Sequence, residues 1–344
     1  MKKLILVTGG TGYIGSHTVV ELIENGYDVV IIDNLYNSEA EVIDRISKIT
    51  GTTPPLEVFD LCDESLLDSF FRKHKNIDGI IHFAAYKAVG ESVHKPLEYY
   101  RNNLVSLMNL LGQMKRNDIP AFVFSSSCTV YGQPEKLPVS EDSPIQPAVS
   151  PYGNTKQIGE EIIRDTVTSS PGIRAIALRY FNPIGAHPSG LIGELPRGVP
   201  ENLVPYITQT AYGLRDELKV FGDDYDTPDG SCIRDYLHVV DLAKAHVTAI
   251  DRLISEKNKS AYEIFNLGTG TGVSVLEAIK SFERATGVKV KYRITGRREG
   301  DIEKIWADPA LANSELGWKT VSTLDEALRT AWEWEKFIRN TIKK

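Results

Sequence analysis

The sequence predicts an α/β protein built on a doubly wound parallel sheet, with a smaller α/β lobe attached. Short aliphatic runs alternate with stretches of roughly 12 to 20 residues that have the apolar spacing of helices. The runs lack polar alternation, which is typical of parallel strands buried on both faces. Regular alternation of strands and helices favours right-handed crossovers and helices on both faces of the sheet.

Six strands are expected in the first half of the chain, and a seventh returns later to the same sheet. They cover residues 4–7, 29–32, 56–59, 79–83, 121–125, 174–178 and 263–267. Helices are expected between them, including residues 15–25 and 96–117. After about residue 182, prolines and glycines crowd together, which indicates loops of the kind that carry substrate sites. We therefore expect one lobe from residues 1–181 and a second from residues 182–344, with a segment near 235–267 returning to the first.

Charge and cysteine content limit the classes of partner. The net formal charge of −7 opposes binding to nucleic acid or anionic membrane, so an anionic substrate needs a local basic site. Cys62, Cys128 and Cys232 have no CxxC spacing, which favours a reducing compartment and no structural zinc. The apolar run after Lys3 is too short for a signal peptide, and no run reaches the about 18 apolar residues of a membrane span. A cytoplasmic protein is expected.

A glycine-rich loop joins the first predicted strand to the first predicted helix. Gly9, Gly12 and Gly15 allow a tight turn, a close approach to a pyrophosphate and close packing of the helix. The N–H groups at the helix N-terminus then face the phosphates. Asp33 ends the second strand, where a carboxylate accepts the ribose hydroxyls of NAD and repels the 2′-phosphate of NADP. The first lobe is therefore expected to be an NAD-binding Rossmann-type domain. Asp60, after the third strand, is either an adenine neighbour or an ordinary turn residue.

Tyr152 and Lys156 form a YxxxK pattern and share one face of a predicted helix. A free tyrosine has a pKa near 10, so it is a poor base at neutral pH. A nearby ammonium and a cationic nicotinamide would stabilise the phenolate, and lowering the pKa to about 7 needs roughly 4 kcal/mol. Ser127 closes a serine run at a strand's carboxyl end, where this architecture places its chemistry. Tyr152, Lys156 and Ser127 are therefore the predicted catalytic residues.

These motifs together resemble the UDP-glucose 4-epimerase family of extended short-chain dehydrogenases/reductases. The matching segments are residues 7–17, 82–92, 125–132, 152–156, 179–183, 234–239 and 297–301. The resemblance implies that Tyr152 takes the proton of the sugar 4-hydroxyl, directly or through Ser127, while a hydride leaves C4 for bound NAD. The hydride then returns to the opposite face of the 4-keto sugar. The implied activity is reversible epimerisation of UDP-glucose and UDP-galactose, with room for a secondary activity on UDP-N-acetylhexosamines.

The resemblance also assigns residues to the two ligands. Besides the catalytic three, the cofactor side comprises Gly9, Gly12, Tyr13, Ile14, Gly15, Asp33, Asn34, Asn37, Ser38, Asp60, Leu61, Phe83, Ala84, Ala85, Lys87, Asn102 and Tyr180. The substrate side comprises Lys87, Ser127, Tyr152, Phe181, Asn182, Asn202, Leu203, Lys219, Val220, Phe221, Arg234, Arg298, Asp301 and Ile305. Arg234 and Arg298 are implied to anchor the diphosphate, which gives the acidic chain its local basic site.

Two further expectations come from the resemblance. Ile305 occupies the position that borders the sugar's C2 substituent in this family, and its intermediate size predicts a preference for UDP-glucose and UDP-galactose over the N-acetyl forms. The helix over residues 96–117 and the helix that carries Tyr152 are implied to form a four-helix interface with their copies. A homodimer is therefore expected.

Three alternative interpretations are disfavoured. A nucleotide-sugar 4,6-dehydratase commonly has an Asp-Glu pair where this chain has Ser127 and Cys128. A non-catalytic dinucleotide sensor can lose the YxxxK pattern, which is intact here. The acidic segment over residues 223–230 lacks the spacing and final glutamate of an EF-hand, so no metal site is expected.

Overall fold

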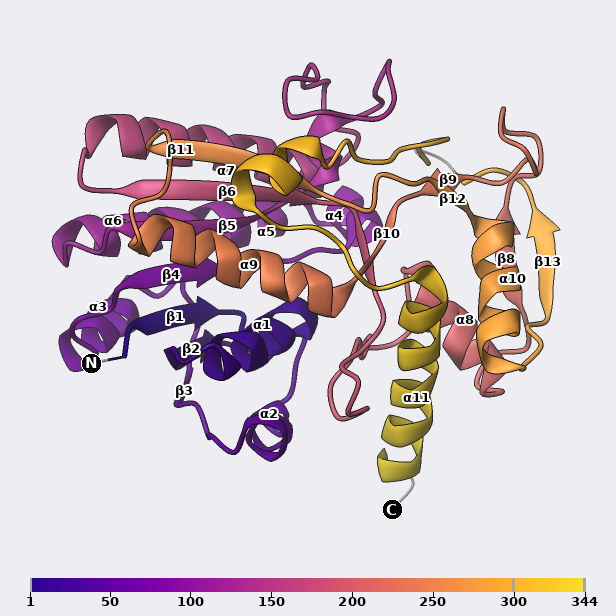
Figure 1. Cartoon of the computed structure of the whole chain (residues 1–344), viewed down its shortest axis with the longest axis horizontal. Helices are drawn as coiled ribbons and strands as arrows, with labels where there is room; N and C mark the ends of the chain where they lie inside the picture. The colour runs from indigo at the N-terminus through magenta and orange to yellow at the C-terminus, as the bar shows by residue number, and fades with distance from the viewer. Residues whose placement is uncertain (1, 299–300, 343–344) are drawn as a thin grey trace.

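The computed structural model describes residues 2–298 and 301–342, and its centre is a seven-stranded parallel sheet (Figure 1). The strand order is β11-β6-β5-β4-β1-β2-β3. Their bounds are β1 Leu4–Thr8, β2 Asp28–Asp33, β3 Leu56–Val58, β4 Gly79–His82, β5 Ala121–Ser127, β6 Arg174–Tyr180 and β11 Tyr262–Leu267. The predicted doubly wound α/β class is confirmed, and all seven expected strands lie in the sheet.

Apolar residues form this sheet because helices cover both of its faces. Successive residues of a strand point to opposite faces, so Ile5 and Leu6 belong to two different clusters, and neither side chain is exposed to solvent. One cluster joins the sheet to α1 (Tyr13–Glu24), α2 (Val42–Thr50) and α9 (Val239–Ile254). The other joins it to α3 (Glu64–Lys73), α6 (Ser106–Arg116) and α7 (Pro151–Ser169). This double burial explains the near-continuous apolar runs.

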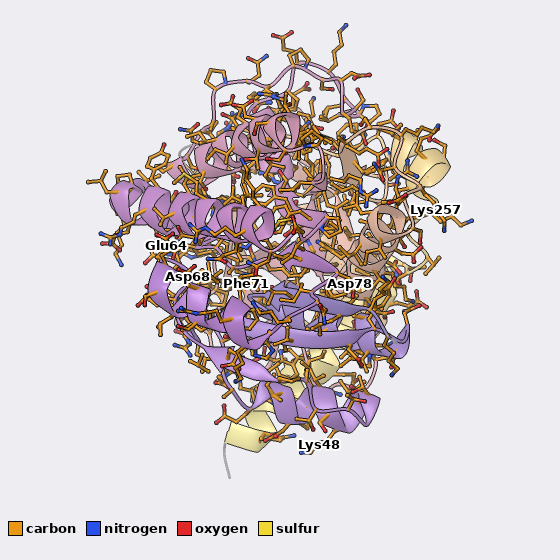
Figure 2. The ribbon with its side chains drawn as sticks, turned by 90° about the vertical axis from the view of Figure 1, so that its left-hand side faces the viewer. Lys48, Glu64, Asp68, Phe71, Asp78 and Lys257 are labelled. Atoms are coloured by element: carbon orange, nitrogen blue, oxygen red, sulfur yellow. The ribbon has the colours of Figure 1, made fainter. Side chains whose placement is uncertain are left out.

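The solvent-facing surface of α3 and α6 is polar and carries ion pairs between the two helices. Phe71 of α3 is buried in the core, whereas Glu64 and Asp68 of the same helix lie outside it (Figure 2). Arg116 of α6 donates to both carboxylates, each at 2.9 Å. Exposed pairs of this kind contribute little stability, about 1 kcal/mol at most. Burial of Phe71 is therefore the stronger link between α3 and the sheet.

The single helix expected over residues 96–117 has a local irregularity. It consists of α5 (Pro96–Tyr100), a π-helical segment (Arg101–Val105) and α6, and α4 (Val89–His94) precedes it. Apolar spacing alone does not reveal this wider turn, because the helical periodicity continues on both sides. The segment carries Asn102, one of the predicted cofactor-side residues.

The second lobe lies beside the carboxyl ends of the strands (Figure 1). Its helices are α8 Leu203–Ala211, α10 Val275–Thr286 and α11 Leu324–Ile342, which share a separate apolar cluster. Three short strand pairs accompany them: β7 Asn182–Ile184 with β10 Tyr236–His238, β9 Ile233–Arg234 with β12 Val273–Ser274, and β8 Leu218–Phe221 with β13 Tyr292–Thr295. Short helical turns occur at Cys128–Tyr131 and Ala312–Leu316. No helix in the described ranges is both long and apolar enough to cross a membrane.

The segment near residues 235–267 contributes strands to two different sheets. β10 pairs with β7 in a small separate sheet, whereas α9 packs on α1 and β11 pairs with β6 in the main sheet. The chain therefore passes from the sheet to the second lobe and back before α10 and α11 leave it again.

Candidate active site

The glycine-rich loop ends at an uncapped helix N-terminus. Gly12 is the N-cap of α1, no side chain accepts from the first-turn N–H groups, and no acidic residue lies in that turn. A Cβ on Gly15 would lie 2.1 Å from the Gly9 carbonyl oxygen, and one on Gly9 would lie 2.8 Å from the Ala84 nitrogen. Only glycine fits these two positions. The open dipole end and the close backbone approach suit a dinucleotide pyrophosphate.

Asp33 links the glycine loop to the end of β2. Its carboxylate is 8% exposed and accepts from the Thr11 N–H at 3.2 Å, the Leu35 N–H at 2.9 Å and the Ser38 hydroxyl at 3.2 Å. Asn34 turns back and accepts from the Tyr36 N–H at 3.0 Å. The predicted ribose residue therefore lies directly beside the predicted pyrophosphate loop.

The remaining cofactor-side residues follow the carboxyl ends of neighbouring strands. Asp60 accepts from the Cys62 N–H at 2.8 Å, which is the bond expected of an ordinary turn aspartate. Asn102 donates to Asn103 at 2.9 Å, and the Tyr13 hydroxyl donates to the Gly185 carbonyl at 2.7 Å. The others lie after β2, β3 and β4 or at the end of β6: Asn37, Ser38, Leu61, Phe83, Ala84, Ala85, Lys87 and Tyr180. Parallel strands bring these positions to one edge of the sheet.

Tyr152 lies in the first turn of α7, opposite the end of β5. Ser150 caps the helix by accepting from the Gly153 N–H at 3.1 Å. β5 runs on to Ser127, two residues beyond the expected 121–125, and Ser127 hydrogen-bonds Tyr152. The Lys156 ammonium donates to the Ser125 carbonyl at 2.6 Å and lies 5.8 Å from the centroid of the Tyr152 ring. The three predicted catalytic residues are therefore together.

Burial shifts the pKa values of this group in opposite directions. It raises the pKa of Tyr152 to about 12, against the lowering hydrogen bond from Ser127. It lowers the pKa of Lys156 to about 8, against the raising charge of Glu160. The expected fall of the Tyr152 pKa toward 7 is thus not produced by the chain alone. A further positive charge beside the phenol would lower this pKa.

The two predicted diphosphate arginines share one carboxylate. Arg234 donates to Asp301 at 2.7 Å, and Arg298 lies 3.5 Å from the same oxygen. The Arg298 guanidinium also lies 5.8 Å from the centroid of the Phe221 ring. The structure therefore brings together four of the predicted substrate-side residues. Glu299 and Gly300 of the 297–301 motif lie outside the described residues.

The sequence and structure comparisons agree on the family. The GDP-mannose 4,6 dehydratase family model matches residues 6–331. The UDP-glucose 4-epimerase of Yersinia enterocolitica is 52% identical over 336 residues, which cover 98% of both chains. The UDP-glucose 4-epimerase of Stenotrophomonas maltophila with bound NAD and formylated UDP-arabinopyranose has a TM-score of 0.95 and 47% identity, covering 98% of this chain and 99% of that one. The Bifidobacterium longum enzyme in complex with NAD+ and UDP gives a TM-score of 0.93, with the same identity and coverage. This chain belongs to the UDP-glucose 4-epimerase family.

Other substrate-side positions differ in what their side chains can reach. In this member of the UDP-glucose 4-epimerase family, Val220 is 1% exposed and packs in the core of the second lobe, whereas Lys219 and Phe221 on either side are exposed. Only the backbone of Val220 can therefore face a ligand. Phe181 and Ile305 belong to the same buried apolar cluster, and the Ile305 side chain is 2% exposed. Asn182 opens β7, and Leu203 opens α8.

Glu194 contacts two of the predicted site residues, although no sequence pattern indicated it. Its carboxylate accepts from Asn202 at 2.7 Å and from Lys87 at 3.2 Å, and thereby joins two predicted ligand residues. Trp334 of α11 donates to the Glu194 carbonyl at 2.8 Å and fixes the loop. A single glutamate in a proline- and glycine-rich loop has no spacing that would identify it. Only the fold shows its position.

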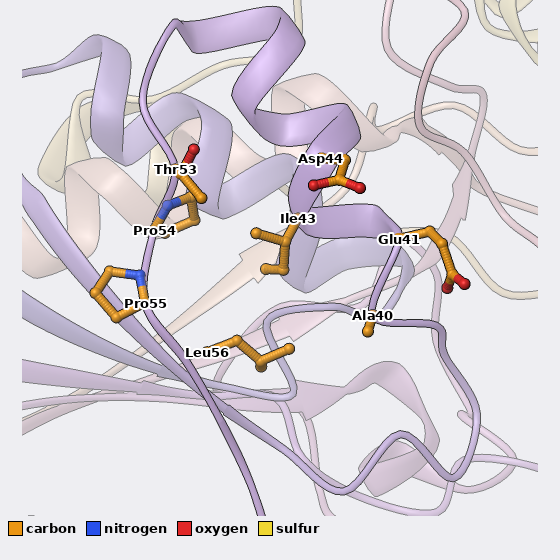
Figure 3. Close-up of a pocket in the computed structure, with 8 residues that line it drawn as sticks. All are labelled: Ala40, Glu41, Ile43, Asp44, Thr53, Pro54, Pro55 and Leu56. Carbon is orange, nitrogen blue, oxygen red and sulfur yellow. The ribbon is translucent and has the colours of Figure 1, made fainter.

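An open cavity of about 540 Å³ elsewhere on the molecule is not part of this site (Figure 3). It lies between the start of α2 and the segment before β3, and Glu41 and Asp44 are its charged lining residues. A cavity lined by two carboxylates and no cation does not suit a diphosphate. Within the described ranges, no three His, Cys, Asp or Glu residues are grouped so as to hold a metal ion.

Proposed function

We propose that this chain catalyses the reversible C4 epimerisation of UDP-glucose and UDP-galactose with bound NAD. One observation carries the proposal: Tyr152, Ser127 and Lys156 meet at the carboxyl end of β5, on the edge of the sheet that also carries the glycine loop. The family relationship over 98% of the chain supports it. We assign dinucleotide binding to residues 1–181 with the returning part of 235–267, and substrate binding to the rest of 182–344.

The glycine loop and Asp33 fit NAD. The uncapped N-terminus of α1 suits the pyrophosphate, and the Asp33 carboxylate suits the ribose hydroxyls. When bound, NAD supplies an oxidant that takes a hydride from C4 of the sugar and returns it. Its positive nicotinamide would also be the missing cation that lowers the pKa of Tyr152 from about 12.

In this mechanism the chain's own residues move and hold one proton. Tyr152 accepts the proton of the sugar 4-hydroxyl, and its hydrogen bond to Ser127 offers a second path for that proton. Lys156 stays positive and stabilises the phenolate. When the hydride returns to the other face, Tyr152 gives the proton back, so no net proton is consumed.

Arg234 and Arg298 are proposed to hold the diphosphate while the sugar turns. Their shared partner Asp301 keeps both guanidinium groups in one place. Lys219, the Val220 backbone and Phe221 are assigned to the uridine side. The sugar side comprises Lys87, Phe181, Asn182, Asn202, Leu203 and Ile305. A firm hold on the nucleotide leaves the sugar free to present either face.

The 4,6-dehydratase alternative needs a free acid and base near C5 and C6. The carboxylate found behind the serine run belongs to Glu160, and Arg179 binds it at 2.5 and 2.9 Å in the protein interior. A carboxylate held in this way is not available for an elimination. The geometry therefore favours the epimerase within a family whose matching model is named for a dehydratase.

The direct test uses the purified chain with no added cofactor and UDP-glucose as substrate. Formation of UDP-galactose, followed by NMR to a constant ratio from either side, supports the proposal. A 4-keto-6-deoxy sugar as the main product would identify a dehydratase instead. Absence of any product, with NAD shown to be bound, would make the dinucleotide-sensor alternative correct.

Replacing Ile305 by alanine is expected to widen the sugar site next to Phe181. The ratio of kcat/KM for UDP-N-acetylglucosamine to that for UDP-glucose should rise by about 10-fold or more. Removing one or two methylene groups from a pocket wall typically changes discrimination between substrates by this amount. Loss of a side chain that is 2% exposed also costs about 2 to 4 kcal/mol of stability. Ile338→Ala, at an equally buried position in α11, controls for that loss. An unchanged ratio in Ile305→Ala would remove Ile305 from the C2 position.

A homodimer through a four-helix bundle is also proposed. Leu97 of α5 is 81% exposed and Met108 of α6 is 48% exposed, which is unusual for large apolar side chains. Leu97→Asp combined with Met108→Asp is expected to convert a dimer to a monomer in sedimentation experiments. Val321→Asp, at a position that is 68% exposed outside these helices, should leave the dimer intact. A double variant that still sediments as a dimer would exclude this face.

The free thiols of Cys62, Cys128 and Cys232 accord with the cytoplasmic location that we propose.

A further inference from the structure

A buried ion pair lies directly behind the proposed catalytic group. The Arg179 guanidinium of β6 binds the Glu160 carboxylate of α7 through two nitrogens, at 2.9 and 2.5 Å. Arg179 is 4% exposed and Glu160 is 7% exposed. Bidentate geometry holds both side chains in one orientation. Nothing in the proton and hydride steps described above uses this pair.

Three further hydrogen bonds extend the pair across the sheet. The Ser126 hydroxyl of β5 donates to Glu160 at 2.5 Å. Arg179 also donates to the Tyr131 hydroxyl at 2.9 Å, and that hydroxyl donates to Asn266 of β11 at 2.7 Å. The pair therefore ties α7 to three neighbouring strands. Ser125 accepts from Lys156, and Ser127 hydrogen-bonds Tyr152. Glu160 therefore contacts Ser126, the residue between these two.

Glu160 is also placed to act on Lys156 by its charge. It lies one helical turn beyond Lys156 on α7, so the two side chains project from the same face. Lys156 is 4% exposed and donates to a neutral carbonyl, so its ammonium has no ion pair of its own. The Glu160 charge opposes the burial that lowers the pKa of Lys156 to about 8.

We propose that Glu160 is a positioning residue for the reaction: it holds the end of β5 against α7 and supplies the counter-charge that keeps Lys156 an ammonium. Arg179 keeps the Glu160 carboxylate ionised and oriented. This inference rests on the proposed function, because it gives Lys156 its importance. It adds a third charged member, four residues further along the helix, to the YxxxK pair.

Other titratable groups around Lys156 set the conditions of the test. Tyr152 shares α7 with it, His82 comes from β4, and Arg179 and Tyr180 come from β6. Burial, together with the positive charge of Lys156, lowers the pKa of His82 to about 3, so His82 stays neutral at any pH used. Tyr180 has a pKa raised far above neutrality by burial. Changes in rate above neutral pH therefore report on Lys156 and Tyr152.

The test compares pH profiles of kcat for the whole enzyme and two charge-matched variants. Lys156 acts while protonated, so activity is present below its pKa and is lost as the pH rises through that value. Glu160→Gln removes the counter-charge and lowers that pKa, so the alkaline limb should move to lower pH by about one unit or more. The KM for UDP-glucose should stay within about 2-fold, since the diphosphate arginines are untouched. Glu161→Gln removes the same charge from the next, exposed position and should keep the wild-type profile.

A second variant protects the test from a failure to fold. Glu160→Gln leaves the buried Arg179 without a carboxylate partner, whereas Glu160→Gln with Arg179→Met removes both charges together. A folded Glu160→Gln should show the shifted limb, the double variant should show a smaller shift because loss of the Arg179 charge raises the pKa of Lys156, and Glu160→Asp should retain the limb of the wild type. An unshifted limb in a folded Glu160→Gln, or a wild-type kcat in the double variant where only that variant folds, would overturn the inference. If the wild type and Glu161→Gln show no epimerisation at all, the proposed function fails instead.

Discussion

Replacing Tyr152 by phenylalanine is expected to lower kcat by about 100- to 10,000-fold while NAD stays bound, because the substitution removes the only proposed proton acceptor and keeps the ring. Tyr152 hydrogen-bonds Ser127, and its ring lies 5.8 Å from the Lys156 ammonium. A serine hydroxyl has no comparable basicity, so Ser127 cannot replace the phenolate. Initial rates with UDP-galactose measure the loss of activity, and the absorbance of the dinucleotide released on denaturation measures how much NAD stays bound.

The matched control for this variant is Tyr27→Phe. The Tyr27 hydroxyl donates to Asp251 at 3.1 Å on the far side of the sheet, so this change also removes one phenol hydrogen bond. Its kcat should stay within about 2-fold of the wild type. A Tyr152→Phe enzyme that retained more than a tenth of the activity would show that another group accepts the proton.

Replacing Gly15 by alanine is expected to abolish NAD retention, and with it the epimerase activity. The new methyl carbon would lie 2.1 Å from the Gly9 carbonyl oxygen and 2.9 Å from the Gly10 Cα. Both contacts are with backbone, so α1 must move away from the loop. Overpacking of this kind costs about 1 to 3 kcal/mol, and the shift also spoils the N–H groups that would face the pyrophosphate. NAD per protein chain after gel filtration should fall by about 10-fold or more.

Gly112→Ala provides the comparison at a helical glycine. A Cβ at Gly112, within α6, meets no atom within 4 Å. Alanine should there raise stability by about 0.5 to 1 kcal/mol through its higher helix propensity and leave NAD content unchanged. If Gly15→Ala purified with a full complement of NAD, the close packing of α1 on the loop would not be needed for binding.

The sheet could be predicted from the sequence because burial on both faces leaves a strong apolar signal. This apolar pattern is absent at the end of β5, where the proposed catalytic residues lie. Ser125, Ser126 and Ser127 are polar, so the pattern ends at residue 125, although the backbone remains paired with β6 as far as Ser127 and Tyr180. A strand that ends in polar functional residues is therefore expected to be predicted too short from its apolar pattern.

The second lobe was much less predictable, for a different reason. β9 and β12 have two residues each, and Arg234 pairs with Val273 nearly forty positions away. Segments this short have no periodicity, and their pairing depends on contacts distant in sequence. The same limit applies to the site: the YxxxK spacing identified Tyr152, whereas the link from Glu194 to Asn202 required the folded chain.

The late position of β11 in the chain has a consequence for biosynthesis. β6 ends at Tyr180, but the strand that covers its outer edge begins only at Tyr262. At ordinary translation rates a ribosome needs roughly 4 to 16 seconds to make the intervening chain. During that interval a nascent chain presents an unpaired, apolar strand edge, which is the surface that recruits chaperones or other nascent strands. Messenger truncations before codon 262 should therefore yield aggregates rather than a stable dinucleotide-binding fragment.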